Sequence, residues 1–194
     1  MAQALIEPLE VDGLYGALVK AMSKRMFGKV PQSLGVMWHH RDGMKAAMTF
    51  GQKVQKFDAC DEQLKAFAHM AVAAQVGCSW CLDFNYFQAF HHGVDVTKAR
   101  DIPRWREVDT FSTLEAEVLG YAEAMTNTPP TVTDEQVISL RDQLGEAALL
   151  ELTSVIGFAN LTTRSNVALG LESEGFADSC GLAPIPIAEA SSRT

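Results

Sequence analysis

The spacing of apolar residues predicts helices along almost the whole chain. Residues spaced four apart indicate a helix over 11–27, which Gly28 ends: Leu14, Leu18, Met22 and Met26. Further helices are predicted at residues 31–38, 44–57, 62–76 and 78–92. In the helix predicted at residues 44–57, the side chains expected to face the core are Ala47, Met48, Phe50, Gly51 and Val54. No segment shows the strict alternation of a strand, so the pattern indicates an all-α chain.

Capping residues place the helices of the second half. Ser112 with Glu115 and Thr133 with Gln136 have the spacing of capping boxes. A long helix over residues 147–171 follows, with an inner face of Leu149, Leu152, Ile156, Ala159, Thr163 and Val167. We expect one domain over residues 1–176, with two similar helical halves at roughly 1–100 and 110–176, and a C-terminal tail at 177–194.

The charge and composition of the chain indicate which binding partners are disfavoured and which cellular compartment is expected. The chain has 194 residues, 24 acidic and 16 basic side chains and a formal net charge of −8, which disfavours nucleic acid and anionic membranes as partners. No apolar run approaches the roughly 20 residues that span a bilayer. Residues 1–12 lack the basic start and apolar stretch of a secretory signal. We therefore expect a cytoplasmic protein, whose cysteines do not form a disulfide framework.

One stretch combines residue type and spacing into a specific chemistry. Cys78 and Cys81 form a Cys-x-x-Cys pair directly after Gly77, which is expected to end one helix just before the next begins. Free N–H groups at a helix start favour a thiolate, and residues three apart lie on one helix face. Trp80 and Phe84 are expected to shield the pair while one sulfur stays reachable. Such a pair can be oxidised by a peroxide and regenerated by an external dithiol.

Two other interpretations of the pair are weaker. Zinc would need further ligands, and a continuous helix would place His91 roughly 15 Å from Cys81 by helical rise. Two buried thiols with a purely structural role are the other alternative. Cys60 and Cys180 stand alone and are expected to be ordinary small, partly apolar side chains. We expect no metal and no cofactor.

The residues around the pair resemble the alkylhydroperoxidase D (AhpD)-like and carboxymuconolactone decarboxylase family. The resemblance is strongest from Asp61 to His92 and extends through residues 114–135 to the long helix containing Gly157-Phe158-Ala159-Asn160 and Arg164. It implies an all-α AhpD-like fold and a homo-oligomer, trimeric or built from trimers. It also implies a thiol-dependent peroxidase, with a peroxide substrate and an external dithiol reductant, in which Cys81 attacks and Cys78 resolves.

The chain departs from this family at two positions. Its peroxidases carry a glutamate twelve residues before the first cysteine and a histidine four after the second, where this chain has Ala66 and Asn85. Glu62 and His69 lie about one helical turn on either side of Ala66 and, with Asn85, are the candidate proton relay. Because general acid–base help is worth about 10²–10⁴-fold, the expected peroxidase is slow.

Two rival functions follow from these departures. The first is a non-enzymatic oligomeric redox sensor that keeps the fold and the thiol pair without rapid turnover. The second is a proton-transfer enzyme like the carboxymuconolactone decarboxylases. It would use Glu62, His69 and His91 as acids or bases and would need no thiol.

Overall fold

The computed structural model describes residues 4–185, and every regular element in that range is helical. The α-helices are α1 (Gly13–Phe27), α2 (Gln32–Met37), α3 (Arg41–Val54), α4 (Glu62–Val76), α5 (Ser79–His91), α6 (Val96–Asp101), α7 (Thr113–Thr126), α8 (Asp134–Leu144) and α9 (Glu146–Ala168). Short 3-10 helices are η1 (Trp38–His40), η2 (Ile102–Glu107) and η3 (Ala177–Cys180). The predicted all-α fold is confirmed. Within the described range, no helix has the length and apolar character that crossing a membrane requires.

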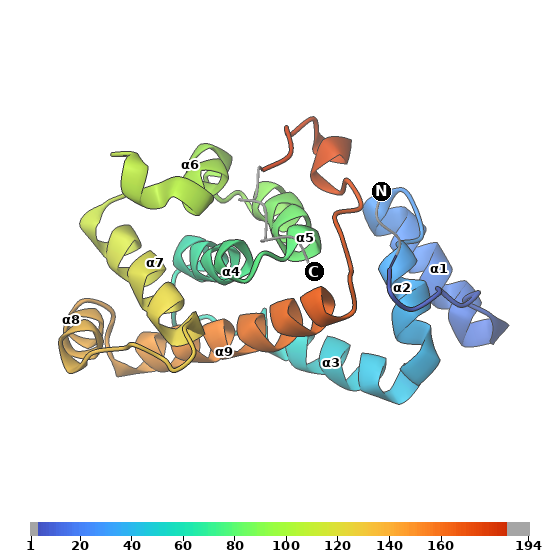
Figure 1. Cartoon of the computed structure of the whole chain (residues 1–194), viewed down its shortest axis with the longest axis horizontal. Helices are drawn as coiled ribbons and strands as arrows, with labels where there is room; N and C mark the ends of the chain where they lie inside the picture. The colour runs from blue at the N-terminus through green and yellow to red at the C-terminus, as the bar shows by residue number, and fades with distance from the viewer. Residues whose placement is uncertain (1–3, 186–194) are drawn as a thin grey trace.

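Helix α4 occupies the centre of the molecule and packs against α5, α7 and α9 (Figure 1). Its buried face carries several alanines, which let neighbouring helices approach, and a few large side chains that fill the gaps between them. Phe67, Met70 and Val72 are completely buried there. Burying these side chains is worth roughly 1.5–3 kcal/mol each. This rigid helix positions the residues of the site described below.

The predicted helix ends are confirmed where local chemistry defines them. The Asp61 side chain caps α4 by accepting from the N–H groups of Gln63 and Leu64. Both capping boxes, at the starts of α7 and α8, are formed. The inner face of α9 is also confirmed, with every predicted residue buried except the half-buried Val167.

The prediction of the core-facing side of α3 is wrong in part. Gly51 and Val54 are buried, but Ala47, Met48 and Phe50 are exposed. Helices α1–α3 lie beside the α4–α9 body and are covered by it on one side only (Figure 1). Gly51 provides this contact, because a Cβ atom at that position would lie 2.9 Å from the Phe158 ring of α9.

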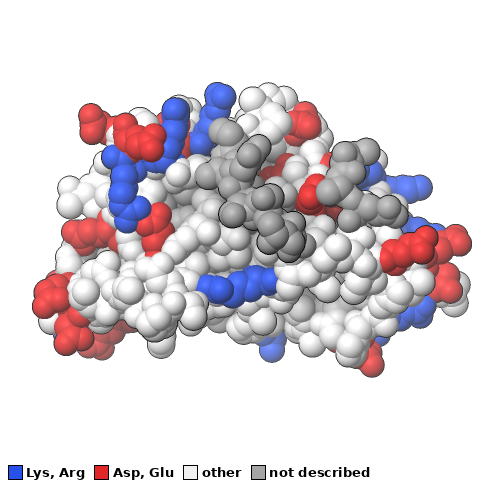
Figure 2. Space-filling view, in the orientation of Figure 1, with Lys and Arg blue, Asp and Glu red and all other residues white. Residues whose placement is uncertain are grey.

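Helix α1 forms as predicted, but its apolar stripe faces solvent. Leu14 is 95% exposed and Leu18 61%, and the helix buries only Gly16 and Ser23. The spacing of apolar residues therefore defines a face of the helix, while nothing in residues 4–185 covers that face. In the orientation of Figure 2, acidic side chains gather toward the ends of the molecule and the middle is largely uncharged.

The segment after α9 turns back and lies across α5. Residues 173–180, called the C-terminal strap here, include Phe176, Ala177 and the short helix η3. Both of these residues are buried. Of the predicted tail at 177–194, residues 186–194 lie outside the described range. The predicted similarity of the two halves stays a prediction.

Candidate functional site

The chain reverses sharply between α4 and α5, and the cysteine pair lies at this turn. Gly77 ends α4 with φ +78°, a left-handed conformation that side chains disfavour. The N–H of Cys78 donates to Ala73 O at 2.9 Å, which closes the turn. Cys78 is then the N-cap of α5, and its sulfur accepts from the N–H of Cys81 at 3.2 Å. The predicted placement of the pair at a helix start is confirmed.

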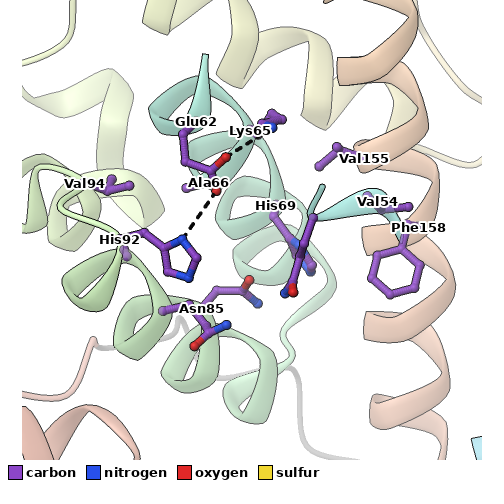
Figure 3. A pocket seen from close by; sticks show the side chains of 13 residues that line it. Val54, Glu62, Lys65, Ala66, His69, Asn85, His92, Val94, Val155 and Phe158 are labelled. Carbon is purple, nitrogen blue, oxygen red and sulfur yellow. Dashed lines mark ion pairs between the residues drawn. The ribbon is translucent and has the colours of Figure 1, made fainter. Parts of the chain in front are cut away.

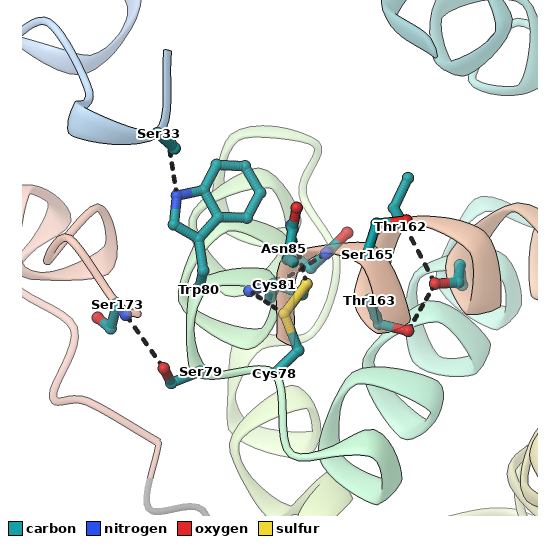
Figure 4. Close-up of a disulfide and its surroundings, with 12 residues drawn as sticks. Ser33, Cys78, Ser79, Trp80, Cys81, Asn85, Thr162, Thr163, Ser165 and Ser173 are labelled. Carbon is teal, nitrogen blue, oxygen red and sulfur yellow. Dashed lines mark hydrogen bonds between the residues drawn. A yellow bond between two sulfur atoms is a disulfide. The ribbon is translucent and has the colours of Figure 1, made fainter. Parts of the chain in front are cut away.

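Cys78 and Cys81 are joined by a disulfide (Figure 4). The sulfurs lie 2.00 Å apart, and the Cα–Cα distance of 5.2 Å is within the usual range for disulfides. Cys78 is 0% exposed and Cys81 1% exposed. The expectation that one sulfur stays reachable is therefore wrong for the chain in this state.

A buried amide on α9 faces the disulfide. Asn166 is 4% exposed, and its Nδ2 donates to the Cys81 sulfur at 3.4 Å. The sequence contained a signal for this residue, because Asn166 follows Thr163 by three positions and so continues the buried stripe of α9. A polar side chain on a core-facing stripe is a candidate for a specific partner, but only the fold identifies that partner as Cys81.

The C-terminal strap covers the first turns of α5 beside the disulfide. The Asp83 carboxylate accepts from the N–H groups of Glu174, Phe176 and Ala177 at 2.9–3.1 Å. The N–H of Ser173 donates to Ser79 Oγ at 3.1 Å (Figure 4). Trp80 stacks on Phe84, which packs against Phe176. Asp83 therefore anchors the strap to α5.

A second feature is a cavity of about 80 Å³ bounded by α3, α4, α5 and α9. It is lined by Val54, Gln55, Glu62, Lys65, Ala66, His69, Asn85, Gln88, Ala89, His92, Val94, Val155 and Phe158. The three predicted relay residues Glu62, His69 and Asn85 all line it (Figure 3). Neither Cys78 nor Cys81 does, although Asn85 Nδ2 donates to the backbone carbonyl of Cys81 at 2.7 Å.

Charged groups at one side of the cavity are paired with one another. Lys65 Nζ lies 3.1 Å from Glu62 and 3.0 Å from Glu151, and His92 Nδ1 lies 3.9 Å from Glu62 (Figure 3). Burial acts to lower the pKa of Lys65, but the hydrogen bonds to Glu151 and Glu62 outweigh it and raise the pKa. Lys65 is therefore a fixed cation at this side of the cavity.

His91, the remaining acid–base candidate from the sequence, does not line the cavity. Its Nε2 lies 3.5 Å from the sulfur of Cys180, and its ring packs on Phe87. The neighbouring His92 takes the place that the sequence suggested for His91. The acid–base role of His91 stays a prediction. Among residues 4–185, no three His, Cys, Asp or Glu side chains gather as a metal site.

His69 makes the stability of the fold depend on pH. Burial lowers its pKa from 6.5 to about 4, so the unfolded chain takes up the proton first. The stability that His69 contributes is complete above about pH 6.5 and is lost as the pH falls toward 4, at up to about 1.4 kcal/mol per pH unit. Urea unfolding between pH 7 and 4.5 should show a shallower loss in His69→Asn, which cannot titrate. Equal slopes in the two proteins would contradict this cause.

Comparison with known proteins places these features in a family. The family model described as "Carboxymuconolactone decarboxylase family" matches residues 41–124, which include the disulfide and most of the cavity. The uncharacterized protein YnjA of Escherichia coli (strain K12) is 30% identical over 129 residues, covering 66% of this chain and 71% of YnjA.

Solved structures match the fold over nearly the whole chain. The debrominase Bmp8, as a cysteine-to-alanine variant in complex with 2,3,4-tribromopyrrole, has a TM-score of 0.76 at 20% identity, covering 91% of this chain and 95% of Bmp8. An uncharacterized peroxidase-related protein with an AhpD core, from Ralstonia eutropha JMP134, has a TM-score of 0.75 at 14% identity, covering 91% and 95%. Identities this low show the shared AhpD-like fold alone. The family model and the similarity to YnjA are matches in sequence, and the shared fold agrees with them. This chain therefore belongs to the carboxymuconolactone decarboxylase family.

Proposed function

We propose that this protein is a thiol-dependent peroxidase whose redox centre is the pair Cys78 and Cys81. The disulfide between them, at the N-terminus of α5, is the observation that carries the proposal. A pair at this position can exist as a disulfide or as two thiols without moving the helix. The N–H groups of the first turn of α5 favour a thiolate in the reduced form.

The cycle needs two substrates and returns the pair to its starting state. The Cys81 thiolate attacks the outer oxygen of a hydroperoxide, ROOH, and with one proton gives a sulfenic acid and ROH. The Cys78 thiol then displaces hydroxide from that sulfenic acid, which forms the disulfide and releases water. An external dithiol reduces the disulfide by exchange and leaves as its own disulfide. The family resemblance supports Cys81 as the attacking sulfur. A reducing compartment such as the cytoplasm would supply the dithiol.

The surroundings of the pair favour slow turnover. Ala66 and Asn85 replace the acid and base of the family's peroxidases, so we infer that the cavity residues Glu62, His69 and His92 carry the protons instead. Both sulfurs are also buried, so a reactant reaches them only when the surrounding structure opens locally. The cavity of about 80 Å³ beside Asn85 has room for hydrogen peroxide or a short alkyl hydroperoxide.

Counting thiols after exposure to peroxide tests the proposal directly. The reduced protein should lose two thiols per chain with hydrogen peroxide, and peptide mapping should find the new bond between Cys78 and Cys81. A small dithiol such as dithiothreitol should then support repeated turnover. If the pair is oxidised once but no steady consumption of peroxide follows, the sensor interpretation replaces the enzyme. If Cys78 and Cys81 stay reduced, both interpretations are wrong.

The composition of the cavity favours a second candidate, a proton-transfer enzyme that needs no thiol. Glu62, His69 and His92 converge there, and neither cysteine lines it. Burial lowers the pKa of His69 to about 4, so its imidazole is neutral near pH 7 and has a free nitrogen lone pair, although it is a weaker base than an exposed histidine. Activity on a lactone that persists after both cysteines are alkylated, and is lost in His69→Asn, would favour this candidate over the peroxidase.

Self-association is the second part of the proposal, and the apolar stripe of α1 supports it. Leu14, Leu18, Met22 and Met26 are all exposed on one face, which is the pattern of a helix that packs against a partner. We expect a homo-oligomer, a trimer or a multiple of trimers. Leu18→Glu should shift the sedimentation mass toward the single chain, because a carboxylate would have to be buried in the contact.

Lys20→Glu is the matched control, because it places the same side chain on the opposite face of α1. It should leave the sedimentation mass unchanged. Because Leu18 is exposed in the single chain, neither variant should alter the helical circular dichroism. If Leu18→Glu sediments like the wild type, the α1 stripe is not the contact surface.

A further inference from the structure

The two sulfurs of the redox pair receive hydrogen bonds from different parts of the fold. Cys78 Sγ accepts from the backbone of its own helix, through the N–H of Cys81 at 3.2 Å. Cys81 Sγ instead accepts from the side-chain amide of Asn166 on α9, at 3.4 Å. These residues are 85 positions apart in the chain, so their contact depends on the packing of α5 against α9.

Asn166 is buried, and a buried amide is costly unless its N–H groups have partners. A disulfide sulfur is a weak acceptor, so the bond to Cys81 gives little in the oxidised state. A thiolate is a much stronger acceptor, because hydrogen bonds to charged groups are about twice as strong as neutral ones. The arrangement therefore favours the reduced, ionised form of Cys81 more than the disulfide.

In the described part of the chain, the side chain that donates a hydrogen bond to Cys81 Sγ is the uncharged amide of Asn166. The titratable groups around the pair are Asp83 of α5, Glu174 of the strap and His69 of α4. Asp83 binds the strap, Glu174 accepts from Trp80 Nε1, and His69 lines the cavity. Within residues 4–185, none of them is hydrogen-bonded to either sulfur.

We propose that Asn166 stabilises the thiolate of Cys81 and thereby sets the reactivity of the redox pair. This inference rests on the proposed function and assigns a role to a residue that was not among the candidates predicted from the sequence. An amide keeps its protons at every physiological pH, so this stabilisation does not weaken as the pH rises. In that respect it differs from a protonated histidine, and it fits a chain that has Asn85 where peroxidases of the family carry histidine.

The size of the effect follows from the strength of charge-assisted hydrogen bonds. Removing the donor should raise the pKa of the Cys81 thiol by about one to two units, a ten- to hundredfold loss of thiolate near neutral pH. It should also make the pair harder to reduce, because the reduced form loses stability. Each tenfold change in the equilibrium constant for exchange with a reference dithiol corresponds to a change of about 30 mV in the reduction potential of the pair.

The test is the pH dependence of Cys81 alkylation by iodoacetamide in the reduced protein, with Cys81 followed by peptide mass. A Cys78→Ser background leaves one thiol of the pair to titrate and avoids coupled ionisation. In this background Asn166→Leu keeps the volume and removes the donor, so the midpoint should rise by one to two units. Asn166→Asp places a carboxylate against the sulfur, so the midpoint should rise further.

Asn160→Leu is the matched control, because the Asn160 amide on the same helix donates to Thr126 and to the carbonyl of Ile156 and not to either sulfur. Its midpoint should stay within a few tenths of a unit of the parent. A purely structural role for Asn166 would change the limiting rate through exposure and leave the midpoint unchanged, which would overturn the inference. The midpoint is measured without peroxide. A shifted midpoint without turnover would therefore support the role of Asn166 and refute the peroxidase. An unchanged midpoint with steady turnover would refute the role of Asn166 and support the peroxidase.

Discussion

Cys81→Ser should reduce the consumption of peroxide to the rate of the solution without protein. The attacking sulfur is the only group in the proposed cycle that bonds to the peroxide oxygen, and a serine hydroxyl is neither ionised nor oxidised under these conditions. The variant should fold, since serine is close in size to cysteine. Its turnover with dithiothreitol and hydrogen peroxide is the quantity to measure.

Cys78→Ser should give a different defect, which separates the two roles. Its Cys81 thiol should react once and stop at the sulfenic acid, which a sulfenic-acid trapping reagent such as dimedone captures. If Cys78 attacks instead, the trapped species will form in Cys81→Ser. The phenotypes of the two variants would then be exchanged.

Cys60 and Cys180 provide controls within the same chain. Burial, together with Glu151, raises the pKa of the Cys60 thiol to about 11, so it is almost entirely protonated at neutral pH. Cys60→Ser and Cys180→Ser should keep wild-type consumption of peroxide. If Cys81→Ser also keeps it, peroxide is not consumed through Cys81, and the proposed cycle is wrong.

The parts of this fold that the sequence predicted are those that local chemistry determines. Asp61 accepts from N–H groups two and three residues away, and Ser112 with Glu115 closes a box within one turn. Gly77 permits a left-handed turn whatever lies around it. Each feature depends on neighbours within a few positions, so residue type and spacing suffice to predict it.

The features that the sequence did not predict depend on residues far apart in the chain. Cys81 and Asn166 meet because α5 and α9 both pack on α4. The C-terminal strap lies across α5 because it returns to Asp83 over 90 or more residues. The apolar stripe of α1 is a second example. Its spacing predicts which face of the helix is apolar, but it does not predict what covers that face. Reactivity and access at this site are therefore properties of the tertiary structure.

Lys65→Met should lower the free energy of unfolding by about 3–5 kcal/mol. The side chains of Lys65 and Glu151 are each only 7% exposed and their charged atoms lie 3.0 Å apart. Methionine fills a similar volume but leaves the carboxylate of Glu151 buried without a cation. Since the free energy of unfolding of a typical domain is about 5–15 kcal/mol, a loss of this size should be evident in urea unfolding.

Two further variants separate charge from packing. Lys65→Met combined with Glu151→Gln should recover most of the loss, because glutamine carries no charge and keeps an acceptor for the N–H of Ala59. Lys45→Met removes a lysine from an exposed pair with Asp42 and should change stability by less than about 0.5 kcal/mol. A cost below about 1 kcal/mol for Lys65→Met would show that Glu151 is not held as a buried charge.

The pH dependence of the same variant gives an independent check on this interpretation. In the wild type, burial acts to raise the pKa of Glu151, but the hydrogen bonds from Lys65, Ala59 and Cys60 outweigh it and lower the pKa. The stability that ionised Glu151 contributes is therefore present above its pKa in the unfolded chain, 4.5, and is lost as the pH falls below that value. Without Lys65, burial dominates and raises the pKa of Glu151, so the folded variant binds a proton more readily than the unfolded chain. The stability deficit of Lys65→Met should therefore shrink as the pH is lowered from 7 toward 4.5, whereas a deficit caused by lost packing would stay constant.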